Sequence, residues 1–322
     1  MRERRGGDGD FGTRVPSGQH SQPLPDLQPR LKGNSFIHRH APALAVIPVL
    51  IVALFFYFGS AIWSVVMSLT ASKIFPDMHF VGLRQYVRLF RDDLWSLSLR
   101  NLLVYVGGSL GSLVLGFILA VLLDRKNVGQ RVFRTIYLYP LAISLIITGL
   151  VWQWLFNPSM GLQQFFRDLG FANFNFNWVA DKKKVMYALI LASVWQSAGF
   201  YMVLSSSGIQ GIDSEIWQAG RVDGISKFRM YIEVIIPMMK FTFLTSFVLL
   251  SIGAVKAYDI IVAMTNGGPG GHSVLPSYYI VDMYIVRQNI AVGASGSTIL
   301  LLLVVACILP FGIVNLILKR RK

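Results

Sequence analysis

The sequence is poor in charge and almost devoid of cysteine, and each shortage excludes a class of protein. Charged residues make up 14% of the 322 residues, whereas a soluble globular protein carries about a quarter. The single cysteine, Cys307, lies in an apolar run, which excludes an intramolecular disulfide and a thiolate metal cluster. With 54% hydrophobic residues and a mean hydropathy of +0.54, the composition is typical of a polytopic membrane protein.

The residue patterns that would mark an enzyme are also missing. No G-x-x-x-x-G-K-[S/T] loop is present to hold a nucleotide phosphate. The glycine-rich run Gly267–Gly271 is followed by His272 and Ser273, with no lysine. Of the five histidines only His38 and His40 are close in sequence, and no third type of metal ligand is arranged around them. We therefore expect no catalytic residues, no metal site and no cofactor bound by this chain.

The net charge of +14 does not indicate a nucleic-acid partner, because the basic residues lie in tails and between apolar runs. Residues 1–40 form a polar tail ahead of the first apolar run. Within it, Met1–Gly33 is rich in Gly, Pro and Arg and has too little apolar surface to offset the entropy of ordering. We expect this segment to be mostly disordered. It does not resemble a cleavable signal, because the following run is too long for an h-region.

Six apolar stretches are each long enough to cross a hydrocarbon core of about 30 Å, which takes about 20 helical residues. They are Ala43–Leu69, Asn101–Leu123, Ile136–Phe156, Val185–Ile209, Phe241–Ala263 and Ser297–Leu318. A membrane β-barrel would instead show alternating patterns of about ten residues. We predict an all-α, polytopic fold with about six transmembrane helices in a domain over residues 41–322.

Basic residues are distributed unequally between the two sides that six spans create. The side with both termini, the 124–134 loop and the 210–240 loop carries 19 Lys and Arg, and the other side carries 10. The positive-inside rule therefore predicts that both termini and these loops are cytoplasmic. On the opposite side, Gly82–Phe90 mixes apolar and basic residues at helical spacing. This segment is either a helix on the membrane surface or a solvated connector, and the pattern favours neither. There too, Phe171–Trp178 mixes aromatic residues with Asn and suits a membrane interface.

The 210–240 loop is predicted to fold as a short helix, a sharp turn and a second helix. Asp213 and Ser214 offer an N-cap. Gly224 permits the left-handed conformation that ends a helix, and Ser226 can cap the next one. Pro237 falls where the chain re-enters the membrane.

One surface of the first loop helix consists of small residues, Ala219 and Gly220, that a partner could approach closely. Ile216, Ala219 and Val222 are expected on one helix face. The alternative interpretation is an ordinary amphipathic connector on the membrane surface.

The order of residues in this loop resembles the cytoplasmic loop of ABC importer permeases, in the sugar-importer branch of the maltose type. The family pattern is E-A-A-x-x-D-G-A, an aromatic, then I-x-x-x-x-P, and the stretch Gln218–Ile225 stands in register with it, followed by Phe228, Ile232 and Pro237. Three positions depart: Gln218 replaces Glu, Gly220 replaces Ala, and Ile225 replaces Ala. Further blocks resemble the family in the same order, namely Phe80–Leu83, Phe133–Tyr137 with Pro140, Trp152–Asn157, Trp195 with Gly199 and Phe200, Asp259 with Thr265–Pro269, and Gly293–Ser297.

The resemblance implies an inner-membrane permease subunit of a binding-protein-dependent importer for a sugar or sugar derivative, working by alternating access. The implied partners are a second permease subunit, two ATP-binding subunits that hold the ATP, and an extracytoplasmic solute-binding protein, beside the lipid bilayer. By this resemblance the ATPase-coupling residues are Glu215, Trp217, Gln218, Ala219, Gly220, Asp223, Gly224 and Pro237. The chain itself would not be an enzyme.

Polar residues within the apolar runs are candidates for the substrate path, because ionisable groups in a membrane are costly. They are Trp195, Gln196, Tyr201, Lys256, Tyr258 and Asp259. Aromatic faces can stack on sugar rings, and Gln can bond to hydroxyls. The alternative is a structural role: helix packing for Trp195, Gln196 and Tyr201, and an ion pair on one helix face for Lys256 and Asp259.

Two other classes of function compete with this interpretation. A stand-alone secondary transporter would need internal repeats and broken helices near the midplane, and the first three spans show no repeat in the last three. An intramembrane enzyme would need a nucleophile or an acid pair deep in the spans, and the sequence shows none.

Overall fold

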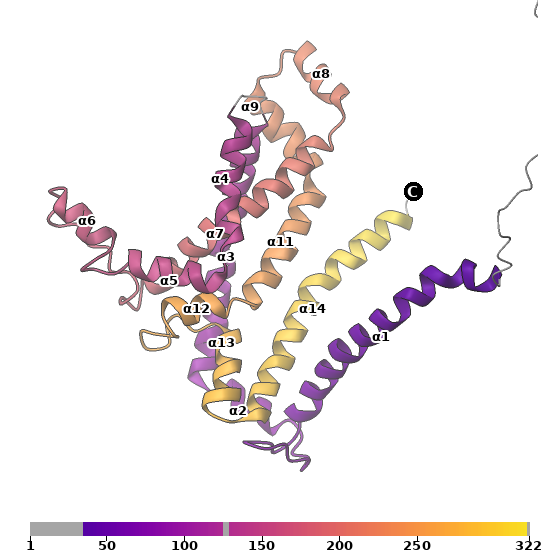
Figure 1. Cartoon of the computed structure of the whole chain (residues 1–322), viewed down its shortest axis with the longest axis vertical. Coiled ribbons are helices and arrows are strands. Elements are labelled where there is room, and N and C mark those ends of the chain that lie inside the picture. The colour runs from indigo at the N-terminus through magenta and orange to yellow at the C-terminus, as the bar shows by residue number, and fades with distance from the viewer. Residues whose placement is uncertain (1–34, 125–128, 321–322) are drawn as a thin grey trace, which may run out of the picture. The chain divides into compact units, whose positions relative to one another are not determined.

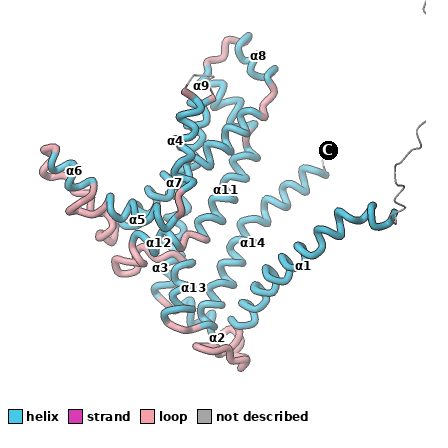
Figure 2. The backbone as a smooth tube through the Cα atoms, in the orientation of Figure 1, coloured by secondary structure: helices cyan, strands magenta, loops and turns pink. Residues whose placement is uncertain are grey.

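The computed structural model describes residues 35–124 and 129–320, and these residues form helices and loops without a β-strand (Figure 2). The helices are α1 (Ser35–Ser68), α2 (Arg84–Phe90), α3 (Asp93–Leu123), α4 (Gln130–Ala142), α5 (Leu145–Leu155), α6 (Leu162–Asp168), α7 (Val185–Gln210), α8 (Ser214–Val222), α9 (Lys227–Met230), α10 (Ile236–Met238), α11 (Lys240–Val255), α12 (Asp259–Met264), α13 (Pro276–Val281) and α14 (Ile290–Arg320). Two π-helical stretches, η1 (Tyr231–Ile235) and η2 (Asp282–Val286), lie between them. Residues 1–34 of the expected tail are outside the described residues, and residues 35–40 belong to α1.

Contacts within the chain separate two units, Met1–Leu54 and Phe55–Lys322, with the boundary inside α1. The described part of the first unit is the beginning of α1. The second unit holds all the other helices, and α2 and α8 lie at its opposite ends (Figure 1).

Among the described residues, four helical segments are long and apolar enough to cross a membrane: Val46–Ser68, Asp93–Leu123, Val185–Gln210 and Ile290–Leu309. Two sharply bent helix pairs bring the number of spans to six if each pair is one span. The prediction of an all-α polytopic fold is confirmed. Of the six expected spans, Ile136–Phe156 and Phe241–Ala263 are each interrupted by a break between helices.

The third apolar stretch is broken into α4 and α5, which meet at an angle of 98°. Ile143 and Ser144 have extended backbone angles, and the Ser144 side chain accepts a hydrogen bond from the Ile147 amide, so it caps a new helix. Pro140, one turn before the break, lacks an amide donor and weakens the end of α4. A broken helix is tolerated in a membrane where neighbouring groups satisfy the freed backbone atoms.

The fifth apolar stretch also departs from a single helix. A bend of 69° at Met239 separates Lys227–Met238 from α11. At its other end α11 stops at Val255, and α12 begins only at Asp259. Lys256 is exposed at the end of α11, where its charge avoids burial in a continuous apolar helix.

Close helix crossings hold the second unit together around α7. At Gly116 of α3, an added Cβ atom would lie 2.7 Å from the backbone of α7 at Tyr201 and Met202. At Gly199 of α7, an added Cβ would collide with the Tyr137 carbonyl oxygen of α4. Because lipid supplies little hydrophobic force between helices, such close approach is a main source of membrane helix association.

Two buried clusters lie along this packing. One includes Trp95, Leu189 and Tyr279 and extends toward α2 and α13. The other includes Met202, Met230 and Met239 and lies beneath the α8–α9 loop. The loop is therefore in direct contact with a buried core.

Candidate functional site

The structure confirms the expected helix–turn–helix in the loop. α8 ends at Val222, Gly224 has a φ of +67°, and the Ile225 amide donates to the Gly220 carbonyl over 3.0 Å. This is the left-handed helix end that glycine adopts without strain. Ser226 caps α9 by accepting from the Arg229 amide.

The start of α8 differs in one respect from the expectation. Asp213 occupies the N-cap position of α8, but its side chain accepts no capping hydrogen bond. Its backbone carbonyl accepts from the Ile216 amide instead. Glu215 in the first turn still places a negative charge at the positive end of the helix dipole.

The underside of α8 is anchored to the second loop helix. The Trp217 ring meets the Tyr231 ring edge to face, with centroids 5.6 Å apart. A Cβ atom at Gly220 would lie 2.8 Å from the Met230 sulfur, and Gly220 is buried. The prediction that Ala219 and Gly220 form one outward surface is therefore wrong for Gly220, whose lack of a side chain admits Met230.

The prediction that Ile216 shares one face of α8 with Ala219 and Val222 is also wrong. Ile216 and Trp217 are half-buried, and with Gly220 they occupy positions i, i+1 and i+4, which form one helix face toward the core. Ala219 and Val222 belong to the opposite, exposed side.

The outer surface of the loop carries exposed, large apolar side chains. Val222 is 87% exposed and Phe228 is 78% exposed. They lie among the exposed polar residues Glu215, Gln218 and Asp223. An apolar tip with a polar rim is typical of a protein–protein contact.

The loop is joined to the membrane helices by a continuous, buried connection. η1 carries Ile235, which is fully buried, and the bend follows at Met239, which is also buried. Arg229 and Glu233 form an ion pair of 2.8 Å across α9 and η1. Pro237 lies in α10 just before the bend and is exposed. Packed side chains therefore connect α8 to the beginning of α11.

The first three candidates for the substrate path lie on α7 in different environments. Gln196 is buried, and its Nε2 donates to the Ile143 carbonyl at the α4–α5 break over 2.9 Å. Tyr201 is buried where α7 crosses α3. Trp195 remains 39% exposed and meets Trp152 of α5, ring edge to face. Of these three, only Trp195 offers a free aromatic face.

The other three candidates are gathered at the α11–α12 junction, but the expected ion pair is not formed. Lys256 follows the end of α11 and Asp259 begins α12, so they do not share a helix, and neither belongs to an ion pair in the part of the chain described. Tyr258 is half-buried and its ring stacks on Tyr278 at 6.1 Å. Asp259 is half-buried at the positive end of the α12 dipole.

Two polar groups on α5 were missed by the sequence reasoning. The Thr148 hydroxyl and the Trp152 indole N–H are buried and have no hydrogen-bond partner in the described chain. Buried polar groups without a partner are rare and call for an explanation such as a bound molecule. Both lie on α5 of the broken span, and the Trp152 ring contacts Trp195. In the sequence, the indication was that Thr148 and Trp152 are a polar and an aromatic residue within an otherwise apolar run.

The end opposite α8 is tied together by polar contacts between distant segments. Asn101 of α3 donates to the carbonyls of His272 and Val274. The Tyr279 hydroxyl donates to Asp92 over 2.7 Å. Burial, followed by this hydrogen bond and the charge of Asp92, raises the pKa of Tyr279 well above its usual range. Tyr279 therefore stays a neutral donor that holds α13 against the start of α3.

A substitution of Gln196 tests whether this residue stabilises the fold or contacts the substrate. Replacing it by leucine removes the donor and leaves the Ile143 carbonyl unsatisfied, which costs about 1–3 kcal/mol of stability. We expect Gln196→Leu to lower the thermal unfolding midpoint in detergent, with Gln210→Leu, an exposed position on the same helix, as the control. A higher substrate KM with unchanged stability would contradict the structural role and place Gln196 in the path.

Comparisons with known proteins agree with this geometry. Residues 112–322 match the model of the family described as "Binding-protein-dependent transport system inner membrane component". The chain is 36% identical to a probable ABC transporter permease protein of Pyrococcus horikoshii over 83% of this chain and 93% of that protein. It is 31% identical to the trehalose/maltose transport system permease protein MalF of Thermococcus litoralis, over 85% of this chain and 91% of the relative.

A solved structure shows the same fold. A chain in the crystal structure of a bacterial alginate ABC transporter, in complex with an alginate pentasaccharide-bound periplasmic protein, superposes with a TM-score of 0.72 at 17% identity, over 85% of this chain and 94% of that chain. The match extends beyond the loop that first suggested the resemblance. The chain belongs to the binding-protein-dependent inner membrane components, the permease subunits of ABC transporters.

Proposed function

We propose that this chain is a membrane-spanning subunit of an importer for a sugar or sugar derivative, and that separate ATPase subunits drive it by pushing and pulling on the α8–α9 loop. The proposed assembly contains a second permease subunit, two ATP-binding subunits and an extracytoplasmic solute-binding protein. Both termini and the α8–α9 loop face the cytoplasm in this proposal. The chain binds no ATP and catalyses no reaction of its own.

One observation carries the proposal: the exposed apolar tip of the loop sits on a rigid, buried support. Val222 and Phe228 are exposed, whereas Trp217 and Gly220 pack α8 against Tyr231 and Met230. A tip that only covered the membrane surface would not need this connection to α11. A tip that receives force needs both a contact surface and a stiff link.

The substrate class is supported more indirectly. The relative from Thermococcus litoralis is named for trehalose and maltose. In this chain, the partly exposed Trp195 ring contacts Trp152, and Thr148 lies one turn before Trp152 on α5. The polar atoms of Trp152 and Thr148 have no hydrogen-bond partner among the described residues. Aromatic faces with unfilled hydrogen-bonding groups suit a polyhydroxylated ligand. We propose that these residues line part of the path, together with Tyr258 and Asp259 at the α11–α12 junction.

Cross-linking tests the docking surface directly. In a Cys307→Ser background, Val222→Cys and Phe228→Cys are each co-expressed with the proposed ATPase and second permease subunits. We expect both cysteines to cross-link to the ATPase subunit, whereas Leu169→Cys, at a position 60% exposed just after α6, does not.

Transport by reconstituted protein separates the competing classes. Sugar uptake into proteoliposomes is expected only with the ATPase subunits and ATP present. Uptake by this chain alone, driven by an ion gradient, would show a secondary transporter. Photo-labelling of this chain alone by an ATP analogue, at the level of a true ATPase subunit, would refute the proposal that only the partner subunits bind ATP.

A further inference from the structure

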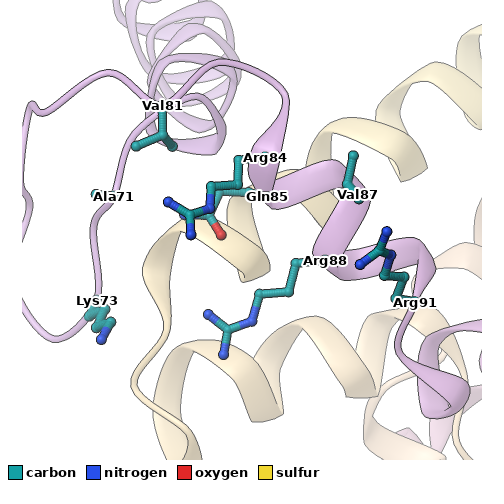
Figure 3. A pocket seen from close by; sticks show the side chains of 8 residues that line it. All are labelled: Ala71, Lys73, Val81, Arg84, Gln85, Val87, Arg88 and Arg91. Atoms are coloured by element: carbon teal, nitrogen blue, oxygen red, sulfur yellow. The ribbon is translucent and has the colours of Figure 1, made fainter.

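A basic pocket lies beside α2, at the end of the molecule away from the α8–α9 loop. Its volume is about 540 Å³, within the range of small-molecule sites. Lys73, Arg84, Arg88 and Arg91 line it together with the apolar side chains of Val81 and Val87, and no acidic residue lines it (Figure 3). We call this the α2 pocket.

The helical spacing of α2 gathers the arginines. Arg84, Arg88 and Arg91 follow at i, i+4 and i+7, so they share one side of the helix. The other side is held by Leu89, which is fully buried, and by Gln85, whose Nε2 donates to the Thr70 carbonyl over 2.9 Å. The pocket therefore has a fixed wall.

Lys73 comes from the loop between α1 and α2, which is itself tied to α14. The Ile290 amide donates to the Lys73 carbonyl, and the Ala291 amide donates to the Ser72 carbonyl over 3.0 Å. In Figure 3 the guanidinium groups of Arg84 and Arg88 point toward the same open space, with Lys73 on its far side. Three cationic groups thus converge from two anchored segments.

These cations form no ion pair within the described chain. The ion pairs found there involve Asp181, Glu233 and Asp282, and none includes a residue of the pocket. The nearby Asp92 carboxylate is outside ion-pair distance of Arg88 and accepts a hydrogen bond from Tyr279. Like charges held together repel one another, so a bound anion would lower the repulsion between these cations.

The surroundings of the pocket are apolar and lie at the end of a membrane span. Phe75, Phe80, Leu83 and Phe90 are between 52% and 79% exposed around α2. The span that ends at Ser68 leads directly into this segment. Basic and large apolar residues on one short segment are typical of contact with the membrane interface, where lipid phosphates lie beside acyl chains.

We propose that the α2 pocket binds the phosphate of an anionic phospholipid. Arg84 and Arg88 donate to the phosphate oxygens, because the planar guanidinium matches phosphate geometry. Lys73 adds a third positive charge, and the acyl chains lie along the exposed apolar residues next to α2. The bound lipid would fix α2 against the beginning of α14 by neutralising the cations between them.

The experiment uses the full chain in mild detergent and measures lipid binding by native mass spectrometry. Phosphatidylglycerol is the probe, phosphatidylcholine the zwitterionic comparison and inorganic phosphate the soluble comparison. We expect Arg84→Gln with Arg88→Gln to weaken phosphatidylglycerol binding about tenfold or more, because each charge-assisted hydrogen bond contributes appreciably. Arg84→Lys with Arg88→Lys should retain an intermediate affinity.

The matched control is Arg100→Gln with Lys183→Gln, which removes the same charge from exposed positions outside the pocket. Its lipid binding should equal that of the unchanged chain. Equal phosphatidylglycerol binding by the pocket variant and the control variant would overturn the proposal. Inorganic phosphate binding as tightly as the lipid would also overturn it and show a free-anion site. Unchanged lipid binding with loss of solute-binding-protein docking would instead assign the pocket to a protein contact.

Discussion

Replacing Gly224 by valine is expected to abolish ATP-driven uptake while the chain still inserts in the membrane. Gly224 has a φ of +67°, where a β-branched side chain clashes with the backbone. The conformational cost is roughly 1–2 kcal/mol. The loop can relieve it only by moving α8 relative to α9. Such a movement displaces Val222 and Phe228 from the surface that we assign to the ATPase.

The effect should be specific to the loop, because little else depends on this turn. No heavy atom lies within 4 Å of a Cβ built at Gly224, so the substitution creates strain without a packing clash. The measurement is sugar uptake and sugar-stimulated ATPase activity in proteoliposomes, with membrane insertion followed separately. Gly224→Asn should retain part of the activity, since Asn tolerates this conformation better than other residues.

Gly170→Val is the matched control. Gly170 also has a positive φ, +100°, and open space around it, but it lies in the loop after α6. It therefore carries similar strain at a place away from the α8–α9 loop. If Gly170→Val and Gly224→Val impair transport equally, the effect is general instability. If Gly224→Val transports normally in an intact complex, the loop is not the coupling element.

The features that follow from local chemistry could be predicted from the sequence. Apolar run lengths located the spans, since a membrane helix must satisfy its own backbone within the lipid. The turn at Gly224 and the cap at Ser226 also followed from residue type, because each depends on the conformation of one or two residues.

The features that depend on partners distant in sequence could not be predicted. The break at Ile143 is stable because Gln196, more than fifty residues away, donates to the freed carbonyl. Gly220 looked like an outward surface until Met230 was found packed against it. Apolar periodicity shows that a residue lies on a face, but not which neighbour covers that face.

The candidates for the substrate path also depend on contacts that the sequence does not reveal. In the sequence, Gln196 and Lys256 are candidates for the same reason, because each is a polar residue within an apolar run. The structure makes one a buried backbone partner and leaves the other exposed at a helix end. Thr148 and Trp152 are candidates only because their buried polar atoms have no hydrogen-bond partner in the described part of the chain, which is a property of the fold.

Replacing Gly199 by alanine is expected to destabilise the fold, because no space exists for even one carbon. An added Cβ would collide with the Tyr137 carbonyl and lie 3.1 Å from the Tyr137 carbonyl carbon and 3.3 Å from Leu138 Cα. These are backbone atoms of α4, so relief requires the whole helix to move away from α7. Overpacking of this kind costs about 1–3 kcal/mol.

The movement would also strain the neighbouring polar contact. Gln196 lies one turn before Gly199 on the same side of α7 and bonds to Ile143 at the end of α4. Displacing α4 lengthens that hydrogen bond. We therefore expect Gly199→Ala and Gln196→Leu to be less than additive in a double variant, since both disturb one interface.

Gly253→Ala is the control for Gly199→Ala, because the two substitutions are expected to shift the thermal unfolding midpoint in opposite directions. Gly253 lies in α11, is exposed, and has no atom within 4 Å of a built Cβ. Alanine at an open helical position favours the folded state by about 0.4–1 kcal/mol. The thermal unfolding midpoint in detergent should therefore rise or stay level for Gly253→Ala and fall for Gly199→Ala. A Gly199→Ala midpoint at or above that of the unchanged chain would mean that α4 and α7 do not cross at this distance.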